Sequence, residues 1–179
     1  MARWGLALVG ATLALAQMAV AEETALDKAM QKDPGRFSDR VTDLIVGFGG
    51  PDGLRAAGIE EHIALERAGG RAAALRRLLA MDLDADGALD RRELSVSQRA
   101  ANAATRGRME RQFAAADANA DGLIDAGEMQ ADGQVAALRS LGEAEAGMLR
   151  ALMTLDADGD GALTVAELDL ALARIGDTT

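Results

Sequence analysis

Three twelve-residue stretches of this chain carry oxygen-bearing side chains at the same positions. Positions 1, 3, 5 and 12 hold carboxylates, with one amide at position 3 of the second stretch, and position 6 is always glycine. The stretches are residues 82–93, 117–128 and 156–167. Oxygens two residues apart on a tightly turning loop converge on one point, and a hard cation of calcium's size takes six to eight oxygens at about 2.3–2.6 Å. The spacing therefore predicts three cation-binding loops.

The expected ligands in each loop are the side chains at positions 1, 3, 5, 9 and 12 and the backbone carbonyl at position 7. They are Asp82, Asp84, Asp86, Ala88, Asp90 and Glu93; Asp117, Asn119, Asp121, Leu123, Asp125 and Glu128; and Asp156, Asp158, Asp160, Ala162, Thr164 and Glu167. Position 9 would act directly or through water. The glutamate at position 12 can offer both oxygens, which suits Ca²⁺ better than Mg²⁺ because magnesium demands a tight octahedron. We therefore expect three calcium sites.

The pattern D-x-[DN]-x-[DN]-G-x₅-E is met in all three loops, and position 8 is apolar in each (Leu89, Ile124 and Leu163). The loops therefore resemble those of the EF-hand family. This resemblance implies helix–loop–helix hands that work in pairs, with position 8 of one loop meeting position 8 of its partner in a short ribbon. The chain is also rich in Ala, Leu, Arg and Glu and poor in β-branched residues. We expect an all-α fold of paired EF-hands with short two-stranded ribbons.

A fourth, degenerate hand is predicted over residues 37–67. Asp-Gly pairs recur at residues 52, 86, 121 and 160, at intervals of 34, 35 and 39 residues. With Asp52 taken as position 5, four positions that need a side-chain oxygen hold none: they are Phe48, Gly50, Ala56 and Ile59. This hand would be kept for packing, because hands pair and an odd one leaves an apolar face uncovered. The alternative is an unrelated helical hairpin.

Sequence order suggests the domains. We expect a signal peptide at 1–21, an N-terminal extension at 22–36, one hand pair at 37–101 (the degenerate hand with loop 82–93) and a second at 102–179. Expected joints between helices are Pro34-Gly35, Gly69-Gly70, Gly107, Asp132-Gly133 and Gly142. Residues 91–116 would form one long helix, or two helices broken at Gly107.

The N-terminus is typical of an exported protein. A short basic start at Arg3 precedes an apolar run from Trp4 to Val20, and Ala19-Val20-Ala21 offers a cleavage site after Ala21. We therefore expect a periplasmic or secreted protein that has no membrane segment after cleavage.

Composition argues against several classes of function. The net charge is −10, with no basic face to meet phosphates of nucleic acid, and the chain has no cysteine. A lone histidine, His62, and scattered serines form no catalytic arrangement, so we expect no enzyme. The arginines at 99, 106, 108 and 111 are expected to form a solvated helix face, and the methionines at 81, 109, 129, 148 and 153 to lie in the core or in a groove.

Three roles are compatible with these features. In the first, calcium is a structural or buffered ligand of an exported module. In the second, calcium opens the hands, and an apolar, Met-lined groove binds a protein partner. In the third, the protein is an accessory scaffold or inhibitor subunit that calcium makes rigid.

Overall fold

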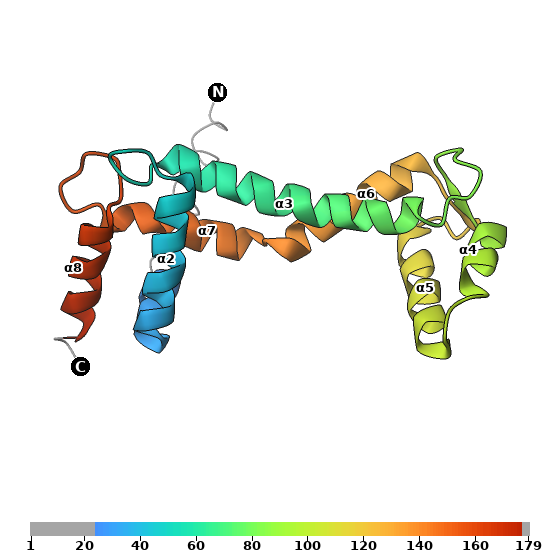
Figure 1. Ribbon diagram of the computed structural model, residues 1–179, viewed down its shortest axis with the longest axis horizontal. Coiled ribbons are helices and arrows are strands. Elements are labelled where there is room, and N and C mark those ends of the chain that lie inside the picture. The colour runs from blue at the N-terminus through green and yellow to red at the C-terminus, as the bar shows by residue number, and fades with distance from the viewer. Residues whose placement is uncertain (1–23, 177–179) are drawn as a thin grey trace, which may run out of the picture. The chain divides into compact units, whose positions relative to one another are not determined.

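The computed structural model describes residues 24–176, and these are helical apart from loops and one short ribbon. A helix over residues 24–32 is followed by α2 (Pro34–Phe48), α3 (Ala56–Leu79), β1 (Leu89–Asp90), α4 (Arg91–Gln98), α5 (Ala103–Ala116), β2 (Leu123–Ile124), α6 (Ala126–Ser140), α7 (Glu143–Ala151), the 3₁₀ helix η1 (Leu152–Leu155) and α8 (Val165–Gly176) (Figure 1). The all-α prediction is confirmed. The predicted signal peptide lies outside the described residues, and no helix within them is long and apolar enough to cross a membrane.

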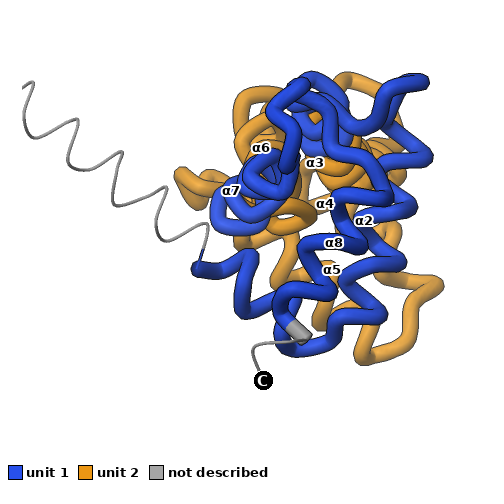
Figure 2. The backbone as a smooth tube through the Cα atoms, turned by 90° about the vertical axis from the view of Figure 1, so that its left-hand side faces the viewer, with its two compact units in different colours: residues 1–63, 143–179 blue, residues 64–142 orange. Residues whose placement is uncertain are grey.

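The chain divides into two compact units, coloured separately in Figure 2. Unit 1 comprises residues 1–63 and 143–179, and unit 2 comprises residues 64–142. Helix α3 begins in unit 1 and ends in unit 2. Each unit is described below by itself.

Unit 2 is built around the pairing of loop 82–93 with loop 117–128. Strands β1 and β2 are antiparallel, and Leu89 lies opposite Ile124. Both side chains are fully buried, because they join one apolar cluster with residues from the four surrounding helices. The other buried members of the cluster are Leu78, Met81, Leu94, Phe113, Ala116 and Met129. The expected meeting of position 8 residues across a ribbon is therefore found between these two loops.

Arg91 fastens α4 to α5 within unit 2. Its guanidinium group lies 4.2 Å from the centre of the Phe113 ring, and its Nη1 donates a hydrogen bond of 2.7 Å to Glu110. Gln98, at the other end of α4, donates to the same carboxylate at 2.8 Å. These contacts hold α4 and α5 side by side, as Figure 1 shows.

The segment 91–116 is neither one helix nor a helix broken at Gly107. Helix α4 ends at Gln98, and α5 begins at Ala103 after a turn. The side chain of Asn102 accepts a hydrogen bond of 2.9 Å from the N–H of Thr105, so it caps the first turn of α5. The capping asparagine was the signal for this boundary, and Gly107 lies inside α5.

Of the other expected joints, Pro34 and Gly142 fall at helix ends, but Gly69-Gly70 and Asp132-Gly133 lie inside α3 and α6. Two of these glycines are packing positions. A Cβ at Gly70 would lie 2.8 Å from the Cβ of Ser140, and a Cβ at Gly133 would lie 3.1 Å from Cγ of Arg71. Glycine therefore lets α3 and α6 approach closely within unit 2.

Unit 1 pairs the loop after α2 with loop 156–167. Leu54 and Leu163 form an antiparallel bridge, with hydrogen bonds of 2.9 and 2.8 Å between their backbone groups. Both side chains are fully buried, as are Met30, Ile59, Leu152 and Leu168. Helices α2 and α8 lie side by side (Figure 1). At the surface, Arg150 donates two hydrogen bonds to Glu60.

The predicted hand pairs differ from those in the structure, because the loops pair differently. The prediction joined loop 82–93 to the degenerate hand and loop 117–128 to loop 156–167, whereas the bridges join 82–93 to 117–128 and Leu54 to Leu163. The turn between α4 and α5 lets the second and third loops meet. Helix α3 runs for 24 residues without a break, so the chain has no turn between the first and second loops.

The register assigned to the first helix–loop–helix also needs a correction. In the other three, the helix after the loop begins at position 10, and Leu163 at position 8 bridges to Leu54. Because α3 begins at Ala56, Leu54 is at position 8 here and not at position 7. Position 12 is then Gly58 and not Ile59. A Cβ at Gly58 would collide with the carbonyl oxygen of Phe48, so a glutamate has no room there.

Candidate metal centre

The predicted cation-binding loops supply the residues that begin the following helices. Asp90 and Asp125, at position 9, are the N-caps of α4 and α6, and their side chains accept from the N–H of Glu93 and Glu128 at 2.7 and 2.8 Å. The glutamate side chains bond back to the cap residues, which completes a capping box. The capping box turns the glutamate side chain back toward the loop. The same residues that begin the helix therefore also orient the position 12 ligand.

The glutamate at position 12 makes the same hydrogen bonds in every loop. Its Oε1 accepts from the N–H at position 2, at 2.7 Å for Glu93, 2.8 Å for Glu128 and 2.9 Å for Glu167. Its Oε2 accepts from the N–H at position 9, at 3.0, 3.2 and 2.9 Å respectively. One carboxylate therefore joins the two ends of each loop and faces its interior.

The aspartates at positions 1 and 5 shape the middle of each loop. Oδ2 of Asp82, Asp117 and Asp156 accepts from the N–H of the position 6 glycine at 3.1, 3.1 and 2.8 Å. The position 5 carboxylate accepts from the N–H at position 7 at 2.8 to 2.9 Å in all three loops. These bonds leave the second lone pairs of the carboxylates available to a cation.

The carboxylates converge in two of the loops. Oxygens of Asp82, Asp84 and Asp86 lie within 4.8 Å of one another, and so do oxygens of Asp156, Asp158 and Glu167. In loop 117–128, position 3 is Asn119, whose Nδ2 donates to Asp121 at 2.9 Å. An amide turned to present its oxygen would be needed for that residue to bind a cation.

Backbone conformation supports the same turn in each loop. The glycines at position 6 have φ of +85°, +88° and +82°, in the left-handed region that favours glycine. Position 4 is also left-handed, and there it is occupied by Ala85 and Ala120, with φ of 59° and 58°. A left-handed alanine costs about 1–2 kcal/mol. The loop tolerates this cost because two left-handed residues turn it so that positions 1, 3 and 5 lie on the same side of the loop.

Burial of carboxylate oxygens tests whether a cation fits. Oδ1 of Asp82 is buried and has no hydrogen-bond partner among the described residues. Leaving a buried acceptor unsatisfied costs about 1–3 kcal/mol, more for a charged group. The side chains of Glu93, Asp117 and Glu167 are buried as well. A calcium ion would satisfy Oδ1 of Asp82 and neutralise the buried carboxylates, and the donor set is entirely oxygen, as this hard cation prefers.

Hydrogen bonding keeps the position 12 carboxylate of the last loop ionised. The backbone N–H of Thr164, then its hydroxyl group and the N–H of Ala157, lower the pKa of Glu167 from 4.5 to about 2. The Thr164 hydroxyl donates at 2.8 Å. Glu167 is therefore an anion, ready to bind metal, at neutral and mildly acidic pH.

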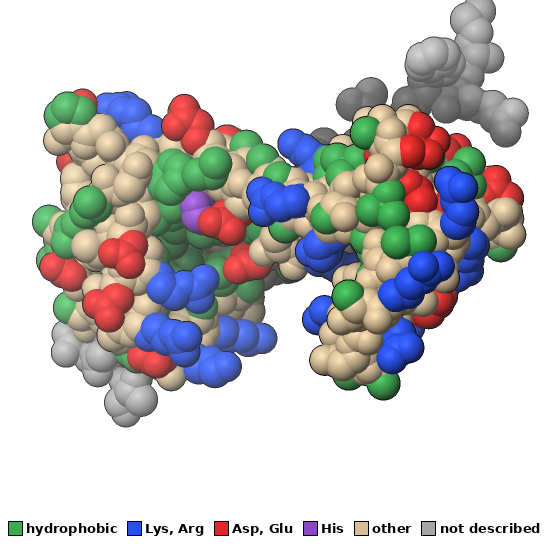
Figure 3. All heavy atoms as spheres, turned by 45° about the vertical axis from the view of Figure 1, so that its right-hand side comes forward, with side chains coloured by type: hydrophobic (Ala, Val, Ile, Leu, Met, Phe, Trp, Pro, Cys, Tyr) green, Lys and Arg blue, Asp and Glu red, His purple; other side chains and the backbone are tan. Residues whose placement is uncertain are grey.

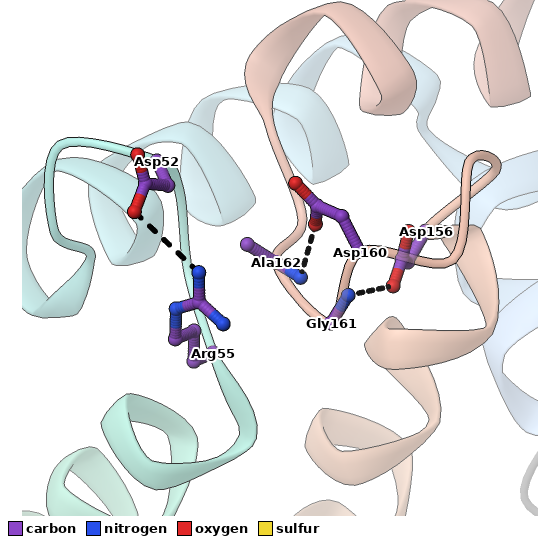
Figure 4. Close-up of polar contacts among 6 residues, drawn as sticks. All are labelled: Asp52, Arg55, Asp156, Asp160, Gly161 and Ala162. Carbon is purple, nitrogen blue, oxygen red and sulfur yellow. Dashed lines mark hydrogen bonds and ion pairs between the residues drawn. The ribbon is translucent and has the colours of Figure 1, made fainter.

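A basic side chain that sequence reasoning did not single out lies beside loop 156–167. Nη2 of Arg55 is 3.5 Å from Oδ2 of Asp52, and Nη1 would be 3.9 Å from a Cβ at Gly161 (Figure 4). Figure 4 shows Asp156 and Asp160 on the loop opposite this pair. The loop that lost its own ligands thus places one positive charge next to the neighbouring calcium loop. The Leu54–Leu163 bridge, which is a long-range contact, helps to bring it there.

Comparison with known proteins agrees with the geometry. A family model described as EF hand matches residues 75–96, 109–131 and 149–171, which contain the three loops. No curated protein and no solved structure matches the chain significantly. The matched segments do not include residues 37–67.

The chain is therefore an EF-hand superfamily protein with three hands. Calcium is the ligand that this family implies, and the acidic loop clusters fit it. The helix–loop–helix formed by α2 and α3 is not matched, but its bridge to Leu163 gives it the place of a partner hand. This supports the prediction of a degenerate hand kept for packing.

Proposed function

We propose that this protein binds three calcium ions, one in each of the loops 82–93, 117–128 and 156–167, and acts outside the cytoplasm as a calcium-stabilised or calcium-buffering module with no catalytic role. The ligands would be the eighteen residues at positions 1, 3, 5, 7, 9 and 12 given above. Bound calcium would supply positive charge to the acidic loops and hold their two ends together.

The observation that carries this proposal is the repeated loop geometry. Each glutamate at position 12 closes its loop through the same backbone hydrogen bonds, and Oδ1 of Asp82 is buried without a partner among the described residues. Buried, unneutralised carboxylates destabilise the folded state. A cation that is bound while the protein folds removes this cost, so calcium is expected to stabilise the fold.

Methionine burial favours the structural role over the sensor role. Met81 and Met129 are buried in the core of unit 2, and Met109 packs against it. In this conformation these thioethers do not form an exposed groove. The sensor role would require the hands to open. The scaffold role would require a constitutive partner. The affinity for calcium helps to distinguish these roles.

Calorimetric titration of the metal-stripped protein with calcium, in the presence of magnesium, tests the proposal. We expect three sites. Glu93→Gln, Glu128→Gln and Glu167→Gln should each reduce the stoichiometry to two, because each removes a bidentate anionic ligand. Dissociation constants of about 10⁻⁴–10⁻³ M would fit a structural role, and constants of about 10⁻⁷–10⁻⁵ M would favour the sensor.

Asp52→Ala is the matched control, because Asp52 is an exposed loop carboxylate outside the three sites. Its stoichiometry should stay at three. A fall to two would show that the loop after α2 binds metal, and an unchanged stoichiometry in any glutamine variant would reject the assignment of that loop.

A further inference from the structure

Unit 2 contains a pocket that the calcium loops do not use. Its volume is about 230 Å³, and it is lined by residues of α3, α5 and α6. Ala74 and Leu78 from α3 are both buried, and with Ala115 from α5 they supply the apolar part of the lining. The expected calcium ligands of this unit are absent from the lining.

Four arginines surround this pocket. They come from three helices: Arg77 from α3, Arg108 and Arg111 from α5, and Arg139 from α6. All four are exposed, and none forms an ion pair with another described residue. Asp132 is the single acidic residue in the lining. Unit 2 contains no lysine, so the blue side chains that Figure 3 shows on this unit are arginines.

This concentration of positive charge is unusual for the chain. The protein has 29 acidic and 19 basic residues, so each arginine has many carboxylates with which it could pair. Elsewhere arginines do so, as Arg91 does with Glu110 in the same unit. Like charges around one pocket repel one another, and an anion bound among them would remove that repulsion. We propose that this pocket binds a phosphate-type dianion, either free or as the monoester of a small molecule.

The ligand class follows from the chemistry of the lining. A guanidinium group is a planar fork of donors that matches two oxygens of a phosphate or sulfate group. The pocket is smaller than the roughly 300–1,000 Å³ typical of sites for drug-sized ligands. It suits one tetrahedral oxyanion with few attached carbon atoms, which would contact Ala74, Leu78 and Ala115. The Asp132 carboxylate lowers the net charge of the lining and should weaken the binding of an anion.

Calorimetric titration of the calcium-loaded protein with sodium sulfate tests the inference, with sodium chloride keeping the ionic strength constant. Sulfate is the probe because inorganic phosphate precipitates calcium. A second titration uses O-phosphoserine, with serine as its control. We expect saturable binding of one anion per chain. Equal affinities would identify a free dianion as the ligand class, and binding of O-phosphoserine at least tenfold tighter would identify a monoester.

Variants locate the site. Arg77→Gln and Arg111→Gln should each weaken binding about tenfold, because each removes charge-assisted hydrogen bonds. Arg76→Gln and Arg106→Gln are matched controls, because these exposed arginines lie on the same helices but outside the lining. Asp132→Asn should tighten binding, a gain that misfolding cannot mimic. The calcium stoichiometry should not change in any of them.

Several results would overturn the inference. One is the absence of saturable binding of either probe. Another is an equal loss of affinity in the control variants, which would indicate general attraction to a basic surface. Unchanged or weaker binding by Asp132→Asn would contradict the placement of the anion in this pocket.

Discussion

The glutamate at position 12 has two roles in loops 82–93 and 117–128. It completes the cap of the following helix in α4 and α6, and it joins the two ends of the loop through backbone hydrogen bonds. Replacing it with glutamine keeps the shape of the side chain but removes the anionic charge. The loss of calcium in these variants should therefore exceed any loss of helix structure, which far-UV circular dichroism of the calcium-free proteins would measure.

Arg55 should tune the affinity of the last loop. Its guanidinium group lies beside loop 156–167 and is paired with Asp52. Both side chains are exposed, so water and salt screen their charges. We expect Arg55→Gln to tighten calcium binding at this loop about two- to fivefold at low salt, and less at high salt. Calorimetry on a Glu93→Gln, Glu128→Gln background would isolate this site.

The partner of Arg55 gives a control of opposite sign. Asp52→Asn leaves the arginine unneutralised, so it should weaken calcium binding at the same loop. Equal affinities for both variants and the parent protein would show that the electrostatic influence of this pair does not reach the site.

At the scale of elements, the ribbon should decide which of the predicted calcium sites influence one another. Loops 82–93 and 117–128 share the pairing of Leu89 with Ile124, whereas loop 156–167 is bridged to a loop without ligands. Ordering one loop of the ribbon should pre-order the other, which makes the second ion easier to bind. We therefore expect two cooperative sites and one independent site.

A single variant can separate these cases. Glu93→Gln should weaken calcium binding at loop 117–128 and leave loop 156–167 unchanged, and NMR spectra of backbone amides at Gly122 and Gly161 would follow the two loops. Unchanged calcium binding at both loops would instead support the pairing that sequence order had suggested, in which loop 82–93 pairs with the degenerate hand.

At the scale of the whole molecule, calcium should stabilise the two units unequally. Unit 2 contains two of the predicted sites and unit 1 contains one, and each unit has its own buried apolar residues. A ligand present at 100 times its dissociation constant stabilises a protein by about 2.7 kcal/mol per site. At such saturation, the gain for unit 2 should be about twice that for unit 1.

Differential scanning calorimetry with and without a calcium chelator would measure these gains. We expect two transitions, both shifted to lower temperature by the chelator. Glu167→Gln should remove the calcium dependence of the unit 1 transition only. A single transition that this variant shifts as a whole would show that the two units unfold together.

Much of the site could be predicted from the sequence because it is local. The ligands of each site lie within twelve consecutive residues, and the cap that begins α4 or α6 is formed by residues of the same loop. The all-α fold class could be predicted from composition because helix propensity is also a local property. The boundary at Asn102 was also local and could have been found from its capping side chain.

Contacts between distant parts of the chain decided the rest. The pairing of Leu54 with Leu163 fixes the register of the first hand and brings Arg55 to a calcium loop more than one hundred residues away in the sequence. Three separate helices place Arg77, Arg111 and Arg139 around one pocket. Spacing along the chain does not predict such long-range contacts, because they depend on which apolar faces pack together and on where the chain can turn.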